Sequence, residues 1–208
     1  IPYLAYSRQD KKDGKQTAIS SRLVADLLEK AGVTKIITMD LHTDQIQGFF
    51  NIPVTHLSSE EIFQKQIGNF LFDDPVIVAP DLGRAKFVKK FAKKAGYELA
   101  FIDKNRIGSK EVECSALIGQ VQGRDVILID DICSTGSTLK AASILCKQNG
   151  AKRISVFVTH GLFAKNVLDI SEIDQFFVTD TVEMLPHQKL AILSVTGLFA
   201  KAVMKNFH

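Results

Sequence analysis

Residues 126–142, VILIDDICSTGSTLKAA, decide the fold class of this 208-residue chain. The run VILI is continuously apolar, which is typical of a strand that is buried on both faces of a parallel sheet. A short polar turn follows, and a helical pattern is predicted over 136–149, with Gly150 directly behind it. A buried strand, a short turn and a helix in this order favour an α/β fold.

The turn after this strand combines acids, hydroxyls and a glycine. Asp130 and Asp131 come where the strand should emerge, and the polar residues that follow are Ser134, Thr135, Gly136, Ser137 and Thr138. Backbone N–H groups in such a turn can converge on one phosphate at the helix N-terminus, and glycine permits the close approach. The acids then need sugar hydroxyls or a metal as partners, so the combination predicts a phosphorylated-sugar site. The alternative is an ordinary helix cap beside two solvated carboxylates.

The rest of the chain repeats the alternation of apolar runs and amphipathic helical patterns. Strands are predicted at 1–6, 35–41, 75–81, 98–103, 153–160, 173–180 and 189–196, and helices at 17–31, after Ser58, at 84–95 and at the end of the chain. This predicts mainly parallel sheets flanked by helices, with ligands bound at the carboxyl ends of the strands. The best candidate for a domain boundary is a turn near 53–58. The chain has no GxxxxGK[ST] loop and no GxGxxG motif, so a P-loop NTPase or a dinucleotide-binding fold has no support.

The composition is that of an ordinary globular protein, with 46% hydrophobic and 24% charged residues. The formal net charge of +3 is too small for a global field that would attract nucleic acid or an anionic membrane. No apolar run is long enough to cross a bilayer, and three cysteines without a CxxC pair favour the reducing cytoplasm. Because the chain opens on Ile1 in strand-like sequence, without a signal peptide, we expect that a preceding segment is missing.

Several motifs carry a resemblance to known families. The stretch 126–142 resembles the phosphoribosyl-diphosphate loop of type I phosphoribosyltransferase folds. DLHTDQIQGFFNIPV at 40–54 and YSRQDKK at 6–12 resemble the signature of the ribose-phosphate diphosphokinases, also called phosphoribosyl-pyrophosphate synthetases. VAPDLGR at 78–84, FIDKNR at 101–106 and VTHGLF at 158–163 follow in that family's order, so the resemblance covers essentially the whole chain.

The resemblance implies two related phosphoribosyltransferase-like lobes, the first of them incomplete. Residues 1–56 would be the remainder of an N-terminal, ATP-binding domain, and residues 57–208 a C-terminal, ribose-phosphate-binding domain. Whether the last helix packs back on the first domain is left open. The family transfers the diphosphoryl group of ATP to the 1-hydroxyl of ribose 5-phosphate, releases AMP and requires magnesium. Its members form homo-oligomers, commonly hexamers.

The resemblance also implies roles for individual residues. Arg8 and Gln9 match an ATP-binding pair, His42 matches a magnesium ligand near the ATP phosphates, and Asp81 matches the second metal ligand. Lys104 and Arg106 match catalytic cations on a mobile flap that follows the strand at 98–103, and Arg106 also matches a contact to ribose 5-phosphate. In the sugar site, Asp130 and Asp131 would hold the ribose 2- and 3-hydroxyls, and residues 134–138 the 5-phosphate.

The chain also departs from the family pattern at a few positions. The departures are Ser134 in place of a common Asp, Ser137 in place of Gly or Ala, Asn105 in place of Arg, Thr55 in place of Asp and Arg84 in place of Gly. These changes keep a second interpretation open, a catalytically weak or regulatory paralogue or fragment that binds ribose phosphates. A third interpretation is a phosphoribosyltransferase, which would use the same loop but consume the diphosphate. The DLH and RQD motifs oppose this third interpretation.

Overall fold

The computed structural model describes residues 1–12, 17–81, 85–106, 113–164 and 166–205. The chain divides into two compact units. Unit 1 comprises Ile1–Ser59, Asp180–Glu183 and Ser194–His208, and unit 2 comprises Glu60–Thr179 and Met184–Leu193. The chain therefore leaves unit 1 twice and returns to it twice. No helix in the described ranges is both long enough and apolar enough to span a membrane.

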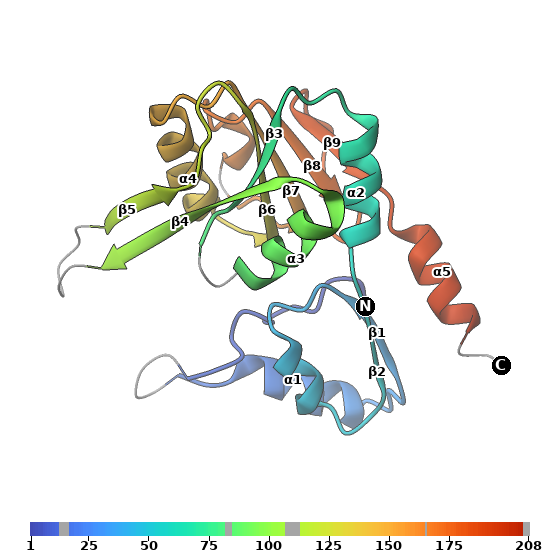
Figure 1. The fold of residues 1–208 in the computed structure, drawn as a ribbon. Coiled ribbons are helices and arrows are strands. Elements are labelled where there is room, and N and C mark those ends of the chain that lie inside the picture. Colours follow the sequence, from blue (N-terminus) through green and yellow to red (C-terminus); the bar gives the residue numbers. More distant parts are fainter. Residues whose placement is uncertain (13–16, 82–84, 107–112, 165, 206–208) are drawn as a thin grey trace. The chain divides into compact units, whose positions relative to one another are not determined.

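Unit 2 is built on one seven-stranded sheet, shown in the upper part of Figure 1. The strand order is β5-β4-β3-β6-β7-β8-β9, and every neighbouring pair is parallel except β4 and β5. The strands are β3 (Pro75–Ala79), β4 (Glu98–Arg106), β5 (Glu113–Ile118), β6 (Asp125–Cys133), β7 (Arg153–Gly161), β8 (Gln175–Thr179) and β9 (Leu190–Leu193). The predicted α/β class with a mainly parallel sheet is confirmed.

Helices cover both faces of this sheet (Figure 1). Side chains of α2 (Glu60–Asn69) and α3 (Ala85–Ala95) share a core with Ile77 and Ile127, whereas those of α4 (Ser137–Gln148) share a second core with Val126 and Leu128. This is the alternation that a strand buried on both faces requires, because successive side chains point to opposite faces. Burial in the second core raises the pKa of the Cys146 thiol to about 12.

Unit 1 holds a two-stranded parallel sheet of β1 (Ile36–Met39) and β2 (Val54–Leu57). Its helices are α1 (Ser20–Lys30), the 3-10 helix η1 (Asp44–Phe49) and α5 (Thr196–Met204). The last helix, α5, contacts β1 and β2, although the whole of unit 2 separates it from them in sequence. A separate small core joins residues of α1, β1 and η1.

The prediction of a strand over residues 1–6 is wrong. The Ile1 amino group donates to the carbonyl oxygen of Ile37 at 3.0 Å, and the Met39 N–H donates to that of Pro2 at 3.1 Å, so the chain begins beside β1. The pairing stops there because proline has no N–H group to donate and Tyr6 adopts a φ of 65°, which turns the backbone.

Two strands were not expected from the sequence. The segment near 53–58, expected to be a turn, contains β2, whose register sets Val54 opposite Ile36. β5 follows the predicted flap and pairs antiparallel with β4, with Ile118 opposite Phe101. Both are short strands at sheet edges, where the partner strand rather than the local sequence stabilises the extended backbone.

Candidate functional site

The strand order marks the point between β3 and β6 as the place to look for a ligand site. From β3 the chain crosses through α3 to β4 on one side, whereas from β6 it crosses through α4 to β7 on the other side. The strand order therefore reverses between β3 and β6, and ligands of open α/β sheets bind outside the carboxyl ends of the strands at this point. Asp81 follows the end of β3, and the predicted phosphate turn follows the end of β6.

The two carboxylates of the predicted sugar site lie inside β6. The strand continues through Cys133 instead of ending at Asp131, and the exposed fractions of Asp130 and Asp131 are 9% and 2%. The Asp131 N–H donates to Asp130 Oδ1 at 2.9 Å, which orients that carboxylate. Two solvated carboxylates beside an ordinary cap would be exposed, so the burial contradicts that alternative. Acids at the carboxyl end of a strand that borders this reversal of strand order are candidates for ligand binding.

Gly136 begins the helix that follows. It occupies the N-cap position of α4 with φ 72° and ψ 4°, a left-handed conformation that favours glycine. Its carbonyl oxygen accepts the Lys140 N–H at 2.8 Å, the first bond of the helix, so the preceding N–H groups are available to a ligand. The hydroxyls of Thr135 and Ser137 lie 3.3 Å apart at the exposed mouth of this turn. This arrangement can hold an anion through backbone N–H groups and hydroxyls together.

In unit 1, the turn that carries Arg8 and Gln9 is exposed but anchored. The Gln9 carbonyl oxygen accepts the Ser21 hydroxyl at 2.8 Å and the Ser21 N–H at 3.3 Å, which ties the turn to α1. The next residue, Asp10, accepts the Thr43 hydroxyl at 2.7 Å. Thr43 is adjacent to His42, so the structure brings the predicted ATP-binding pair and His42 to the same part of unit 1.

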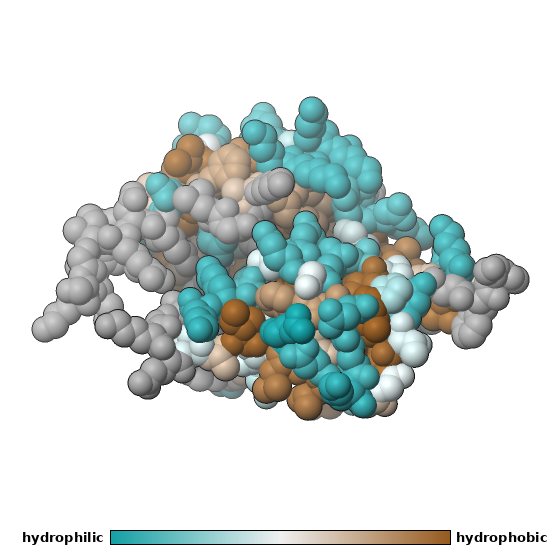
Figure 2. Space-filling model, turned by 90° about the horizontal axis from the view of Figure 1, so that it is seen from below, coloured by the Kyte–Doolittle hydropathy of each residue, from teal (hydrophilic) through white to brown (hydrophobic). Residues whose placement is uncertain are grey.

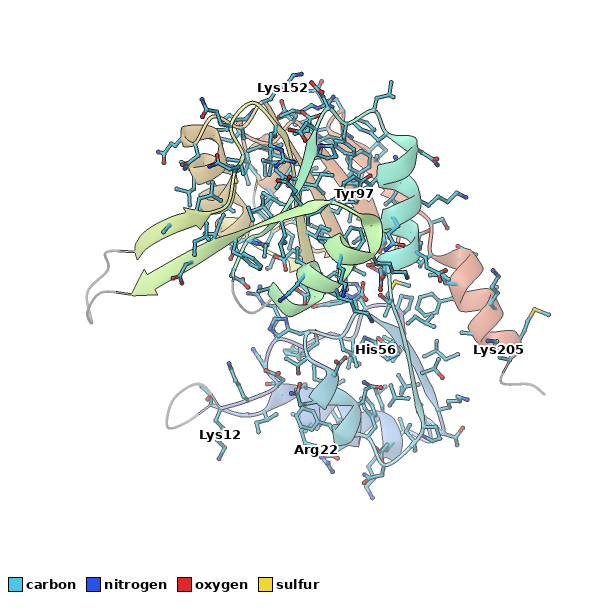
Figure 3. The ribbon with its side chains drawn as sticks, viewed as in Figure 1. Lys12, Arg22, His56, Tyr97, Lys152 and Lys205 are labelled. Atoms are coloured by element: carbon cyan, nitrogen blue, oxygen red, sulfur yellow. The ribbon has the colours of Figure 1, made fainter. Side chains whose placement is uncertain are left out.

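The loop that carries His42 is held on both sides of this residue. Before it, the Leu41 N–H donates to His56 Nε2 at 2.9 Å, and the carboxylate of Asp40 accepts the Ser59 N–H at 3.2 Å. His56 projects from β2, as Figure 3 shows. Asp40 itself has a φ of 36°, which ends β1 and turns the chain toward His42. No sequence pattern predicts the contact of His56, because its partner is a backbone group that is remote in sequence.

Lys104 and Arg106 belong to a strand rather than to a flap that follows one. β4 runs through Arg106, and its register sets Lys104 opposite Ser115. Alternate positions of a strand lie on the same face, so positions 104 and 106 share a face of β4. The side chains of both residues and the rest of the predicted flap, 107–112, lie outside the described residues, as does Arg84.

Known proteins resemble this chain over nearly its whole length. Residues 105–208 match a family described as the phosphoribosyl synthetase-associated domain, and residues 1–32 match the N-terminal domain of ribose phosphate pyrophosphokinase. A ribose-phosphate pyrophosphokinase of Porphyromonas gingivalis is 40% identical over 211 residues, which cover 99% of this chain and 67% of that protein. The chain belongs to the ribose-phosphate pyrophosphokinase family. A pyrophosphokinase of Aquifex aeolicus is 38% identical and is covered to 68% of its length.

A solved structure agrees with this family membership. The crystal structure of phosphoribosylpyrophosphate synthetase from Mycobacterium smegmatis superposes with a TM-score of 0.90 at 36% identity, and the match covers 99% of this chain and 70% of that one. The resemblance that the DLH and RQD motifs carry is therefore confirmed. The chain spans about two thirds of the length of these pyrophosphokinases.

The metal ligands expected from the pyrophosphokinase resemblance lie in different units, His42 in unit 1 and Asp81 in unit 2. Within the described residues, no group of three or more His, Cys, Asp or Glu side chains is arranged to hold a metal ion. Asp81 is a hard oxygen donor that suits Mg²⁺, whereas an imidazole nitrogen is a less usual ligand for it. A magnesium ion bound by Asp81 would take its other ligands from substrate phosphates and water, as Mg²⁺ commonly does.

The contact between Leu41 and His56 gives the first prediction. His56→Leu should lower the free energy of unfolding by about 1–3 kcal/mol, because the buried Leu41 N–H loses its acceptor. It should also raise the apparent Kd for ATP, because the loop that carries His42 is released. Chemical denaturation and ATP titration measure the two effects. His56→Gln keeps an acceptor and should be milder in both; equal effects of the two variants would contradict the role given to this hydrogen bond.

Proposed function

We propose that this chain catalyses the family reaction, the transfer of the β,γ-diphosphoryl group of ATP to the 1-hydroxyl of ribose 5-phosphate. The products are AMP and 5-phosphoribosyl 1-diphosphate, a precursor for nucleotide biosynthesis. The observation that carries the proposal is the pair of buried carboxylates, Asp130 and Asp131, on the strand that leads to the helix N-terminus at Gly136. This strand, β6, borders the point where the strand order reverses. Acids for sugar hydroxyls beside N–H groups for a phosphate fit a phosphorylated sugar.

In this proposal the sugar binds to unit 2. The carboxylates of Asp130 and Asp131 accept hydrogen bonds from the ribose 2- and 3-hydroxyls. The 5-phosphate accepts hydrogen bonds from the backbone N–H groups and hydroxyls of Ser134, Thr135, Gly136, Ser137 and Thr138, and Arg106 adds a charge. Ser134 in the position of a common acid keeps a hydrogen-bonding group and lowers the negative charge beside the bound phosphate.

ATP binds to residues of unit 1. The guanidinium of Arg8 pairs with phosphate oxygens, and the amide of Gln9 reads base or sugar edges. The bond between Asp10 and Thr43 supports this assignment, because it keeps the turn with Arg8 and Gln9 close to His42. We propose Mg²⁺ as the metal, with the carboxylate of Asp81 and phosphate oxygens of the substrates as its ligands. When bound, it offsets the negative charge of the diphosphoryl group.

The chemistry is an attack of the 1-hydroxyl oxygen on the β-phosphorus of ATP. A new O–P bond forms, the bond between this phosphorus and the oxygen that bridges it to the α-phosphorus breaks, and AMP departs. Positioning and charge neutralisation dominate such phosphoryl-type transfers, because little covalent work is left to the protein. Lys104 and Arg106 supply cations to the charge that develops in the transition state.

AMP release from ATP is the experiment that tests the function. We expect AMP and 5-phosphoribosyl 1-diphosphate to form in equal amounts, with dependence on both ribose 5-phosphate and a divalent cation. A regulatory paralogue would bind ribose 5-phosphate in a calorimetric titration but release no AMP. A phosphoribosyltransferase would instead consume 5-phosphoribosyl 1-diphosphate in the presence of a nucleobase and release diphosphate.

We further propose that the enzyme is a homo-oligomer in the cytoplasm. Five large apolar side chains of unit 1, namely Ile1, Tyr6, Leu23, Leu27 and Met204, are each at least 48% exposed. Figure 2 shows brown hydrophobic surface among teal hydrophilic residues on the face that it presents. Exposed apolar surface is typical of contacts with other proteins, and a symmetric oligomer buries such surface between identical subunits. The free thiols of Cys133 and Cys146 suit a reducing compartment.

A further inference from the structure

Gly136 packs against a segment that no sequence motif connects with the sugar site. A Cβ atom at Gly136 would lie 3.0 Å from both γ-carbons of Val167 and 3.4 Å from Cδ1 of Ile170. Val167 begins the 3-10 helix η2 (Val167–Asp169), which lies between β7 and β8. Val167 is 2% exposed and Ile170 is 8% exposed, so both side chains are enclosed where they face the turn.

The connection from β7 to β8, which contains η2, also contacts the residue just before the turn. The N–H groups of Leu162 and Phe163, just past β7, donate to the carbonyl oxygen of Cys133 at 2.8 Å and 3.2 Å. Cys133 is the last residue of β6, immediately before the phosphate turn. Phe163 adopts a φ of 37°, a conformation that a phenylalanine keeps only when its surroundings enforce it. The connection between β7 and β8 thus contacts Cys133, the residue before the turn, and Gly136 within the turn.

The connection between β7 and β8 is also held by Lys189. The ammonium group of Lys189, next to β9, donates to the carbonyl oxygens of Ile170 at 3.1 Å and Ile173 at 2.9 Å. Val167 and Ile170 also belong to the core that contains Leu139 of α4. η2 is therefore a fixed element that packs against Gly136. Val167 lies on the side of Gly136 where a Cβ atom would be, and this packing supports the left-handed backbone of the glycine.

We propose that Val167 is a positioning residue for the ribose 5-phosphate site. The inference rests on the proposed function, because it assigns to Val167 the task of keeping the turn at 134–138 in the shape that receives the 5-phosphate. Val167 makes no contact with substrate. Its two γ-carbons fill the space behind Gly136, so the N–H groups of the turn converge on one point before the ligand arrives. Without this packing, a smaller fraction of molecules holds the competent turn, and the apparent Kd rises by the reciprocal of that fraction.

Val167→Ala tests the proposal. We expect it to weaken ribose 5-phosphate binding by about tenfold in a calorimetric titration, the scale of coupling seen for residues that touch no ligand. Val126→Ala is the matched control, because it is the same change in the same core but near the amino end of β6. It should lower the melting temperature as well and leave the Kd for ribose 5-phosphate unchanged.

Val167→Thr distinguishes an effect of side-chain shape on binding from an effect of lower protein stability. Threonine keeps two branches at Cβ against Gly136 but buries a hydroxyl, so it should lower the melting temperature while binding remains close to that of the wild type. Amide hydrogen exchange adds a readout without ligand: in Val167→Ala, but not in Val126→Ala, the Lys140 N–H, which donates to the Gly136 carbonyl oxygen, should exchange faster than in the wild type.

The outcomes distinguish the two proposals. Unchanged affinity and unchanged exchange in Val167→Ala would overturn the role of Val167, and so would an equal loss of affinity in Val126→Ala. If the wild-type chain fails to bind ribose 5-phosphate, the proposed function fails, and the exchange comparison alone then decides whether Val167 shapes the turn.

Discussion

Gly136→Val is expected to weaken ribose 5-phosphate binding on the order of 10²-fold or more. The Cβ atom of the new valine would lie 3.0 Å from both γ-carbons of Val167. Because the contacts of η2 with the rest of unit 2 keep it in place, we expect the backbone of the turn to move instead. Each charge-assisted hydrogen bond to the phosphate contributes about 1.5–3 kcal/mol, and the loss of two reaches the expected effect. A calorimetric titration with ribose 5-phosphate measures it.

Gly123→Val is the matched control for this prediction. Gly123 has a φ of 74°, close to the 72° of Gly136. Apart from its chain neighbours, no described residue has an atom within 4 Å of the Cβ that a substitution would add there. Both variants therefore carry a similar backbone strain, about 1–2 kcal/mol for a left-handed residue. Only Gly136→Val should lose affinity. If Gly136→Val binds ribose 5-phosphate as the wild type does, the turn at 134–138 is not the phosphate site.

Lys104→Ala is expected to lower kcat on the order of 10²–10³-fold, the loss that follows removal of one preorganised donor to a developing charge. The KM for ribose 5-phosphate should change little, because the cation acts on the transition state rather than on the bound substrate. Rates of AMP release by the wild type and the variant give both constants. Lys104→Arg should restore activity only in part, since a planar guanidinium does not replace a compact ammonium group.

Lys90→Ala serves as the control for the change in charge. Lys90 is an exposed lysine of α3 in the same unit, and its removal changes the net charge by the same amount. Its kcat should stay close to that of the wild type. A near wild-type kcat for Lys104→Ala would show that the end of β4 is a solvated hairpin, and the alternative of a non-catalytic role for this strand would hold.

The parts of the fold that the sequence predicts correctly are those with local causes. The run VILI needs only its own apolar side chains to indicate a buried strand, and the glycine and hydroxyl groups after it indicate the helix start. The sequence did not predict β2 and β5. These two segments are extended because they pair with β1 and β4, and a local sequence pattern does not show such pairing. The strand predicted at 1–6 fails for the opposite reason, since Pro2 and Tyr6 override an apolar run.

The same distinction between local and long-range causes applies to the residues of the candidate site. Residues that would touch a ligand were predicted from their chemistry, as with the acids and hydroxyls at 130–138. His56 and Val167 were not, because a histidine that accepts a backbone N–H and a valine that packs on a glycine look like ordinary surface and core residues in sequence. Their importance arises from contacts between segments that lie 15 or more residues apart, which only the folded chain displays.

The membership of α5 in unit 1 has a consequence for biosynthesis. Unit 2 lies between the two main portions of unit 1 in sequence, so a ribosome completes the seven-stranded sheet before α5 emerges. β1 and β2, made first, must wait for a helix that is translated after about 130 intervening residues. During that interval β1 and β2 lack their contacts with α5, so we expect unit 1 to be the last part of the chain to finish folding.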